Sequence, residues 1–137
     1  MNENQFIFDK DAFQWVAKSR IENQTIEVRF SGYCNKFRVK NHWWVSACIY
    51  NKRKDKSSHY ENFDSSGNIG IKGLIEIKNI LIDFENFVKK QYVDEEHYIV
   101  IWGSDARRRR IYKKYLGKIG YRIGKICGDL VNYKKIN

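Results

Sequence analysis

Residues 98–122 read YIVIWGSDARRRRIYKKYLGKIGYR and contain signals for a strand, a helix and a second strand. Residues 98–102 are continuously apolar, which is typical of a strand buried on both faces. A short polar segment leads into residues 106–119, whose apolar and basic residues fall on different faces of a helix. Gly120 is placed to end this helix, and residues 121–123 to begin another strand. This unit predicts helices packed on a sheet.

The residues before this unit predict the rest of such a fold. Apolar and charged residues alternate at 26–30, as in a strand with one solvated face. Apolar residues at helical spacing over 70–90 indicate a long amphipathic helix. We therefore expect an α+β or α/β fold, a single domain over residues 1–137 with a mixed, mainly antiparallel sheet flanked by helices. The elements expected before residue 98 are a helix capped by Asp9 that runs to about Lys18, strands at 26–30, 37–40, 43–50 and 59–63, and the helix at 70–90.

Composition excludes several classes of protein. With 42% hydrophobic and 15% aromatic residues, the 137-residue chain is not of the disordered type. The first residues show no secretory leader, and no apolar run approaches the roughly 18 to 20 residues that cross a bilayer. Three widely spaced cysteines form neither a disulfide framework nor a zinc motif. These features predict a cytoplasmic protein without a metal site.

The positive charge is concentrated near the C-terminus. The formal net charge is +10, yet residues 1–104 hold 15 Lys and Arg against 14 Asp and Glu. Residues 105–137 hold 11 against 2. Such a field attracts polyanions, so the expected partners are nucleic acid, a phosphorylated cofactor or an acidic protein surface. The alternative is a basic face that only keeps the protein soluble.

Most of these cations lie on the helix at 106–119. Arg107, Arg110, Lys114 and Lys118 share one helical face. Arginines in a first turn face the positive end of the helix dipole, an arrangement that an anionic ligand would relieve. A basic loop after the strand at 43–50 could extend the patch. The candidate polyanion-binding residues are Arg107, Arg108, Arg109, Arg110, Lys113, Lys114 and Lys118 on the helix, and Lys52, Arg53 and Lys54 on the loop.

Residues 98–122 also carry a family resemblance. A strand ends at Ser104 and Asp105, a helix with aromatic residues near its C-terminal end follows, and the Gly120-Tyr121 pair turns into the next strand. This pattern resembles the closing unit of the GNAT family of N-acetyltransferases. The resemblance implies a GNAT-like fold over about residues 9–125 and acetyl-CoA as the cofactor.

The same resemblance implies a cofactor loop. In the GNAT family, a basic residue or Gln followed by a Gly-x-Gly/Ala pattern binds the coenzyme pyrophosphate at a helix N-terminus. The corresponding segment here has Gly67 in the leading position and Lys72 in place of the second small residue. The cofactor-binding residues implied are Gly67, Gly70, Lys72 and Gly73. The alternative is a flexible loop that enters a helix.

The catalytic residue stays unknown at this point. In the GNAT family a tyrosine usually serves as the general acid. Its position falls on Leu116 here, with Tyr115 and Tyr112 close by in the sequence. Both tyrosines can equally be aromatics at the edge of the core. Three isolated histidines, Cys48 and scattered carboxylates show no ligand spacing or nucleophile pairing.

A second resemblance concerns residues 9–90. Their expected order of helix, three strands and helix resembles that of double-stranded-RNA-binding domains, which recognise A-form shape. Only Lys72 and Lys78 provide positive charge near the start of the second helix.

Three functions remain open from the sequence. The leading hypothesis is a small basic intracellular binding or regulatory protein that engages nucleic acid or a protein–nucleic acid complex through its C-terminal helix, without catalysis. An accessory or inhibitory factor of a phage or another mobile element would have this character. The alternatives are a divergent acetyl-CoA-dependent N-acyltransferase and a protein-inhibitory module that binds an acidic protein surface.

Overall fold

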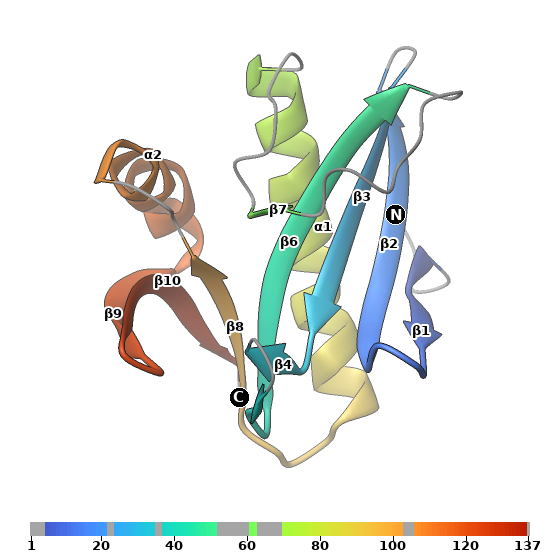
Figure 1. Ribbon diagram of the computed structural model, residues 1–137, viewed down its shortest axis with the longest axis vertical. Helices are drawn as coiled ribbons and strands as arrows, with labels where there is room; N and C mark the ends of the chain where they lie inside the picture. The colour runs from blue at the N-terminus through green and yellow to red at the C-terminus, as the bar shows by residue number, and fades with distance from the viewer. Residues whose placement is uncertain are drawn as a thin grey trace.

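The computed structural model describes residues 5–21, 24–34, 37–51, 61–62, 70–102 and 106–136. Its elements are shown in Figure 1. In chain order they are β1 (Ile7–Asp9), β2 (Gln14–Ile21), β3 (Gln24–Ser31), β4 (Tyr33–Cys34), β5 (Phe37–Arg38), β6 (His42–Asn51), β7 (Glu61–Asn62), α1 (Gly70–Gln91), β8 (His97–Trp102), α2 (Ala106–Leu116), the 3₁₀ turn η3 (Gly117–Ile119), β9 (Arg122–Ile126) and β10 (Asp129–Ile136).

The described strands form one large sheet and one small hairpin. The large sheet has the order β1-β2-β3-β6-β8-β10-β9, with β7 also paired to β6. Neighbouring strands are antiparallel except for β6 and β8, which run parallel. The small hairpin joins β4 to β5. The expectation of a mixed, mainly antiparallel sheet with helices is therefore confirmed.

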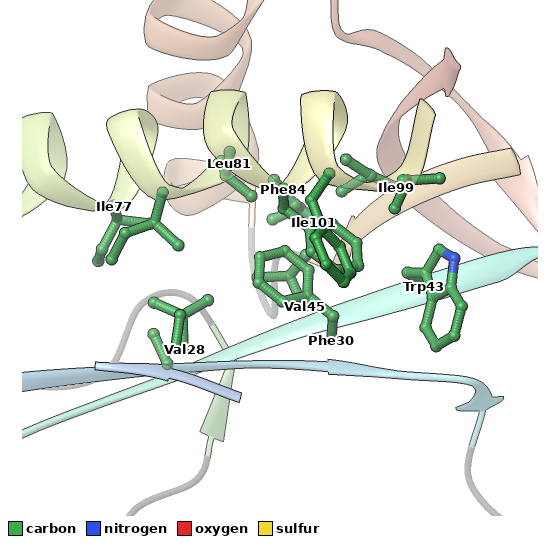
Figure 2. Packing of buried hydrophobic residues seen from close by; sticks show 14 of the residues in the cluster. Val28, Phe30, Trp43, Val45, Ile77, Leu81, Phe84, Ile99 and Ile101 are labelled. Atoms are coloured by element: carbon green, nitrogen blue, oxygen red, sulfur yellow. The ribbon is translucent and has the colours of Figure 1, made fainter. Parts of the chain in front are cut away.

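Helix α1 lies against one face of the sheet and forms the core with it. Ile77, Leu81 and Phe84 recur at helical spacing on its buried face and point toward the strands (Figure 2). The Phe84 ring stacks on Phe30 of β3, with ring centroids 3.7 Å apart. Full burial of such side chains contributes about 1.5–3 kcal/mol each. The predicted helix at 70–90 is confirmed.

The N-terminal helix predicted at 9–18 is wrong. Residues 7–9 and 14–21 are the antiparallel strands β1 and β2. Asp9 accepts hydrogen bonds from the backbone N–H groups of Asp11 (3.1 Å) and Ala12 (3.4 Å), but it closes a turn instead of capping a helix. Phe13 then adopts a positive φ of 49°, which ends any helical path. The resemblance to double-stranded-RNA-binding domains depended on this helix, so the structure does not support it.

The C-terminal part adds a strand that the sequence analysis missed. Strand β8, helix α2 and the helix end at Gly120 agree with the prediction, since Gly120 has a left-handed φ of 98°. Strand β9 then turns back through Cys127 and Gly128, whose φ values of 54° and 83° suit a tight hairpin. The returning strand β10 lies between β8 and β9.

One other predicted strand is shorter than expected, and another is only partly described. At 37–40 only Phe37 and Arg38 form a strand, which pairs with β4 and not with the large sheet. At 59–63 the structure describes only Glu61 and Asn62, which pair with β6 as β7. The strand at 43–50 is confirmed, because β6 spans it entirely.

Both described helices lie on the same side of the large sheet. Leu74 and Ile75 of α1 and Ile111 and Leu116 of α2 line one small apolar cavity between the two helices. Buried side chains from both helices and from the strands belong to one core cluster. Among the described residues, no helix has the length and apolar character needed to cross a membrane.

Candidate nucleic-acid interface

Helix α2 is anchored on one face and basic on the other. Tyr112 and Leu116 are buried in the core cluster, and they line a small apolar cavity of about 60 Å³ between α2 and α1. Arg110, Lys113 and Lys114 are exposed on the rest of the helix surface. Because packing fixes the helix orientation, these cations are held toward solvent.

The cations of this surface are not neutralised within the described residues. Arg110, Lys113 and Lys118 have no described carboxylate within ion-pair distance, and the first turn of α2 contains no acidic residue. The Lys114 ammonium lies 5.7 Å from the centroid of the Tyr115 ring. By contrast, Lys134 of β10 lies 2.7 Å from Glu85. An incoming polyanion would therefore meet unpaired positive charge on α2.

Several predicted polyanion-binding residues lie outside what the structure describes. Residues 107–109 are helical, but the positions of the Arg107, Arg108 and Arg109 side chains are not described. The loop cations Lys52, Arg53 and Lys54 also lie outside the described residues. The basic surface of α2 is therefore defined here by Arg110, Lys113 and Lys114 of α2 together with Lys118 of the adjoining turn η3.

A second basic feature lies at the β9–β10 edge, where sequence reasoning had placed nothing. Strand β9 begins at Arg122, opposite Tyr133, whereas β10 continues for three more residues along β8. The resulting hollow has a volume of about 400 Å³. It is lined by Tyr98, Gly120, Arg122, Tyr133, Lys134 and Lys135.

The charges around this hollow differ in their pairing. Lys135 is 3.1 Å from Glu96, and this hydrogen bond and charge raise the pKa of the Lys135 ammonium above its ordinary value. Lys134 is paired with Glu85. Arg122 is exposed and has no ion pair among the described residues. It is thus the cation of the hollow that is most available to an anion.

The glycines implied by the GNAT resemblance are only partly described. Gly67 lies outside the described residues, Gly70 is the first residue of α1, and Lys72 follows in the first turn. Gly73 is buried within the helix. Among the described residues, β6 and β8 pair from His42 to Trp44, and β7 pairs with the next part of β6 at Ser46 and Ala47.

The tyrosines near the position of the family's general acid are held by packing. Tyr112 is buried and Tyr115 is half-buried. Leu116, at the aligned position, is buried in the core. Burial and the nearby Glu85 charge raise the pKa of Tyr121 well above its ordinary value. This arrangement does not identify an acid that is ready to transfer a proton.

The buried carboxylate of Glu27 and the buried imidazole of His97 have structural contacts. Glu27 is fully buried and lies 3.0 Å from Arg29. His97 is buried and accepts a hydrogen bond from Trp43. In the described part of the chain, no group of three or more His, Cys, Asp or Glu residues is arranged to hold a metal ion.

The basic surface of α2 combines a buried anchor with four exposed cations on one short segment. Comparison of the chain with protein-family models, curated proteins and solved structures finds no match.

Proposed function

We propose that this chain is a small nucleic-acid-binding protein that acts as an accessory or regulatory factor on nucleic acid or on a protein–nucleic acid complex. The observation that carries the proposal is the set of unpaired cations Arg110, Lys113, Lys114 and Lys118 on a helix anchored by its opposite face. Phosphate oxygens are the partners that such closely spaced cations prefer.

The physical basis is the release of counterions. Each Lys or Arg that contacts a phosphate releases condensed cations from the nucleic acid, which favours binding at low salt. Four cations on one surface would give an affinity that falls steeply with salt concentration. The proposal therefore concerns binding without catalysis, and it needs no cofactor.

Charge reversal on α2 tests the proposal. The variant Arg110→Glu/Lys114→Glu should bind a labelled oligonucleotide more than about tenfold more weakly in fluorescence anisotropy. The slope of log K against log salt should also fall in magnitude by about 2, since two phosphate contacts are lost. Both side chains are exposed, so the melting midpoint should stay close to that of the wild type.

The matched control is Lys10→Glu/Arg20→Glu. These exposed residues lie at and beside β2, which is separated from β10 by β3, β6 and β8. The control changes the net charge by the same amount and should retain most of the affinity. Equal losses in both variants would show that only the total charge matters and would contradict a binding surface on α2.

A second candidate is a divergent N-acyltransferase with a GNAT-like fold. It is supported by the parallel pair β6 and β8, whose described pairing ends at Trp44 and Val100, with β7 paired to the next residues of β6. Crevices at the carboxyl ends of parallel strands are common ligand sites. The first turn of α1 fits a phosphate group, because it has no acidic side chain and its N–H groups lack partners within the helix.

Acetyl-CoA titration separates the two candidates. Saturable one-to-one binding in calorimetry, weakened by Lys72→Glu, would favour the acyltransferase. No heat and no change in melting midpoint would remove it. A tight, salt-sensitive complex with an acidic protein and none with nucleic acid would instead favour the protein-inhibitory alternative.

A further inference from the structure

The face of the sheet that points away from α1 carries aromatic side chains on three adjacent strands. Trp43 of β6 and Ile99 and Ile101 of β8 point into the core (Figure 2). Side chains alternate along a strand, so their neighbours point to the opposite face. On that face lie His42 and Trp44 of β6, Tyr98 and Trp102 of β8, and Tyr133 of β10.

These side chains are partly exposed, and three of the rings form a row. None of the five is buried, and Trp102 is 38% exposed. His42 stacks on Tyr98 with ring centroids 4.7 Å apart and planes at 16°. The ring centroid of Tyr98 lies 6.4 Å from that of Tyr133 on the next strand. A hydrogen bond of 2.8 Å between His42 Nδ1 and the Lys40 carbonyl fixes the first ring of the row.

The hollow at the end of β9 adjoins this row. Tyr98 and Tyr133 line it together with Arg122 and Lys135. Tyr133 pairs with Arg122 across β10 and β9, and Tyr98 pairs with Lys135 across β8 and β10, so each ring has a cation on the same face. Rings and cations thus alternate across the sheet edge.

From this arrangement we infer that the open face of β6, β8 and β10 binds a single-stranded segment of nucleic acid. Bases stack on Tyr133 and on the part of the Tyr98 ring that His42 leaves free, and the adjoining phosphates contact Arg122, with Lys135 beside it in its ion pair with Glu96. Exposed aromatic rings interleaved with cations match a chain that alternates flat bases with negative phosphates. In a duplex the base faces are already stacked on each other, so this surface selects unpaired strands.

The inference rests on the proposed nucleic-acid binding and adds to it a division of roles. Helix α2 attracts phosphates of single and double strands alike, because it offers charge alone. The aromatic row adds affinity only for unpaired bases. The two surfaces can therefore be separated by mutation.

The test uses a labelled 12-nucleotide single strand and a 12-base-pair duplex in fluorescence anisotropy at near-physiological salt. Tyr98→Ala/Tyr133→Ala should weaken single-strand binding by about tenfold or more and change duplex binding by less than about twofold. Tyr98→Phe/Tyr133→Phe should keep the wild-type affinity, since it keeps both rings. Tyr33→Ala, at a 39% exposed tyrosine in β4, is the matched control and should have no effect.

Two outcomes separate the aromatic row from the proposed function. An unchanged single-strand affinity in the folded alanine variant overturns base binding by the aromatic row and leaves the proposed function standing. Absence of wild-type binding to both probes overturns the proposed function and the aromatic row together.

A second measurement covers the case in which the alanine variant does not fold. Arg122→Glu changes an exposed side chain and should also weaken single-strand binding more than duplex binding. Equal losses for the two probes would overturn the selectivity that we infer. Bound bases should further quench the tryptophan fluorescence, and Trp102→Phe should reduce that signal, while Trp44 on the same face remains.

Discussion

Trp43 and His97 form a buried hydrogen bond at the point where β6 and β8 run side by side. The indole Nε1–H of Trp43 donates to His97 Nδ1 over 3.1 Å. His97 Nε2–H donates a hydrogen bond of 3.3 Å to the Glu95 carboxylate. The histidine is thus held in one tautomer, as an acceptor toward Trp43.

Replacing His97 by Phe should remove the hydrogen-bond acceptor while keeping an aromatic ring stacked beside Trp43. The Trp43 N–H would then be buried without a partner, so the free energy of unfolding should fall by about 1–3 kcal/mol. Urea denaturation measures this loss. His42→Phe is the control, because His42 is half-buried and its Nδ1 contact is with an exposed backbone carbonyl. A similar loss in both variants would argue against a special role for the buried bond.

Tyr121 provides a prediction about alkaline stability. Its side chain is buried, and its hydroxyl has no hydrogen-bond partner among the described residues. Burial and Glu85 raise the pKa of the folded-state phenol above 10.0, the ordinary value that applies to the unfolded chain. Above about pH 10 the unfolded state loses this proton and the folded state keeps it, so stability falls as pH rises.

Tyr121→Phe should remove this contribution. The free energy of unfolding of the variant should decline less steeply above pH 10 than that of the wild type. Near neutral pH the variant should be equally stable or slightly more stable, because no hydrogen bond is lost with the hydroxyl. Chemical denaturation at pH 7 and at pH 10.5 provides the comparison, and parallel declines in both proteins would contradict the prediction.

At the scale of single elements, the end of α2 depends on Gly120. The N–H groups of Gly120 and Tyr121 donate to the carbonyls of Gly117 and Leu116, each over 3.2 Å. Gly120 has a φ of 98°, and an added Cβ would lie 3.0 Å from Lys134 Cε. This glycine therefore permits both the turn into β9 and the passage of Lys134 beneath it.

Gly120→Ala should lower the free energy of unfolding by about 1–2 kcal/mol, because a left-handed conformation is costly for alanine. Gly117→Ala is the matched control, because an added Cβ there meets nothing within 4 Å. It should be neutral or slightly stabilising. Thermal unfolding followed by circular dichroism measures both changes. A neutral Gly120→Ala would show that the turn has an alternative conformation.

The elements that could be predicted from sequence are those with an uninterrupted local pattern. Helix α1 has apolar residues at helical spacing over 70–90, and β8 has a continuous apolar run over 98–102. The residues after Asp9 misled because Asp, followed by apolar residues at helical spacing, is equally compatible with a side-chain turn between two strands. Strand β10 was missed because Asn132 and Lys134 occupy the face that α1 covers, which breaks the expected apolar alternation.

At the scale of the whole molecule, the two candidate surfaces differ in how far sequence can reveal them. The cations of α2 follow directly from helical spacing within one segment. The aromatic row needs the register of β6, β8 and β10, which brings His42, Tyr98 and Tyr133 together from distant parts of the chain. Sequence patterns define faces of single elements but not the order of strands, so this surface could not be predicted.

The position of β10 has a consequence for the order of events during synthesis. Strand β10 lies between β8 and β9, although it is made after both. At a synthesis rate of about 5–20 residues per second, β10, the second neighbour of β8, is completed a few seconds after β8. Strands β1, β2, β3 and β6 can meanwhile pair through contacts close in sequence, which are the fastest to form. The apolar edge of β8 is therefore the last strand edge of the nascent chain to find a partner. When β10 pairs with it, the hollow beside Arg122 and the sheet face that we assign to single strands are both complete.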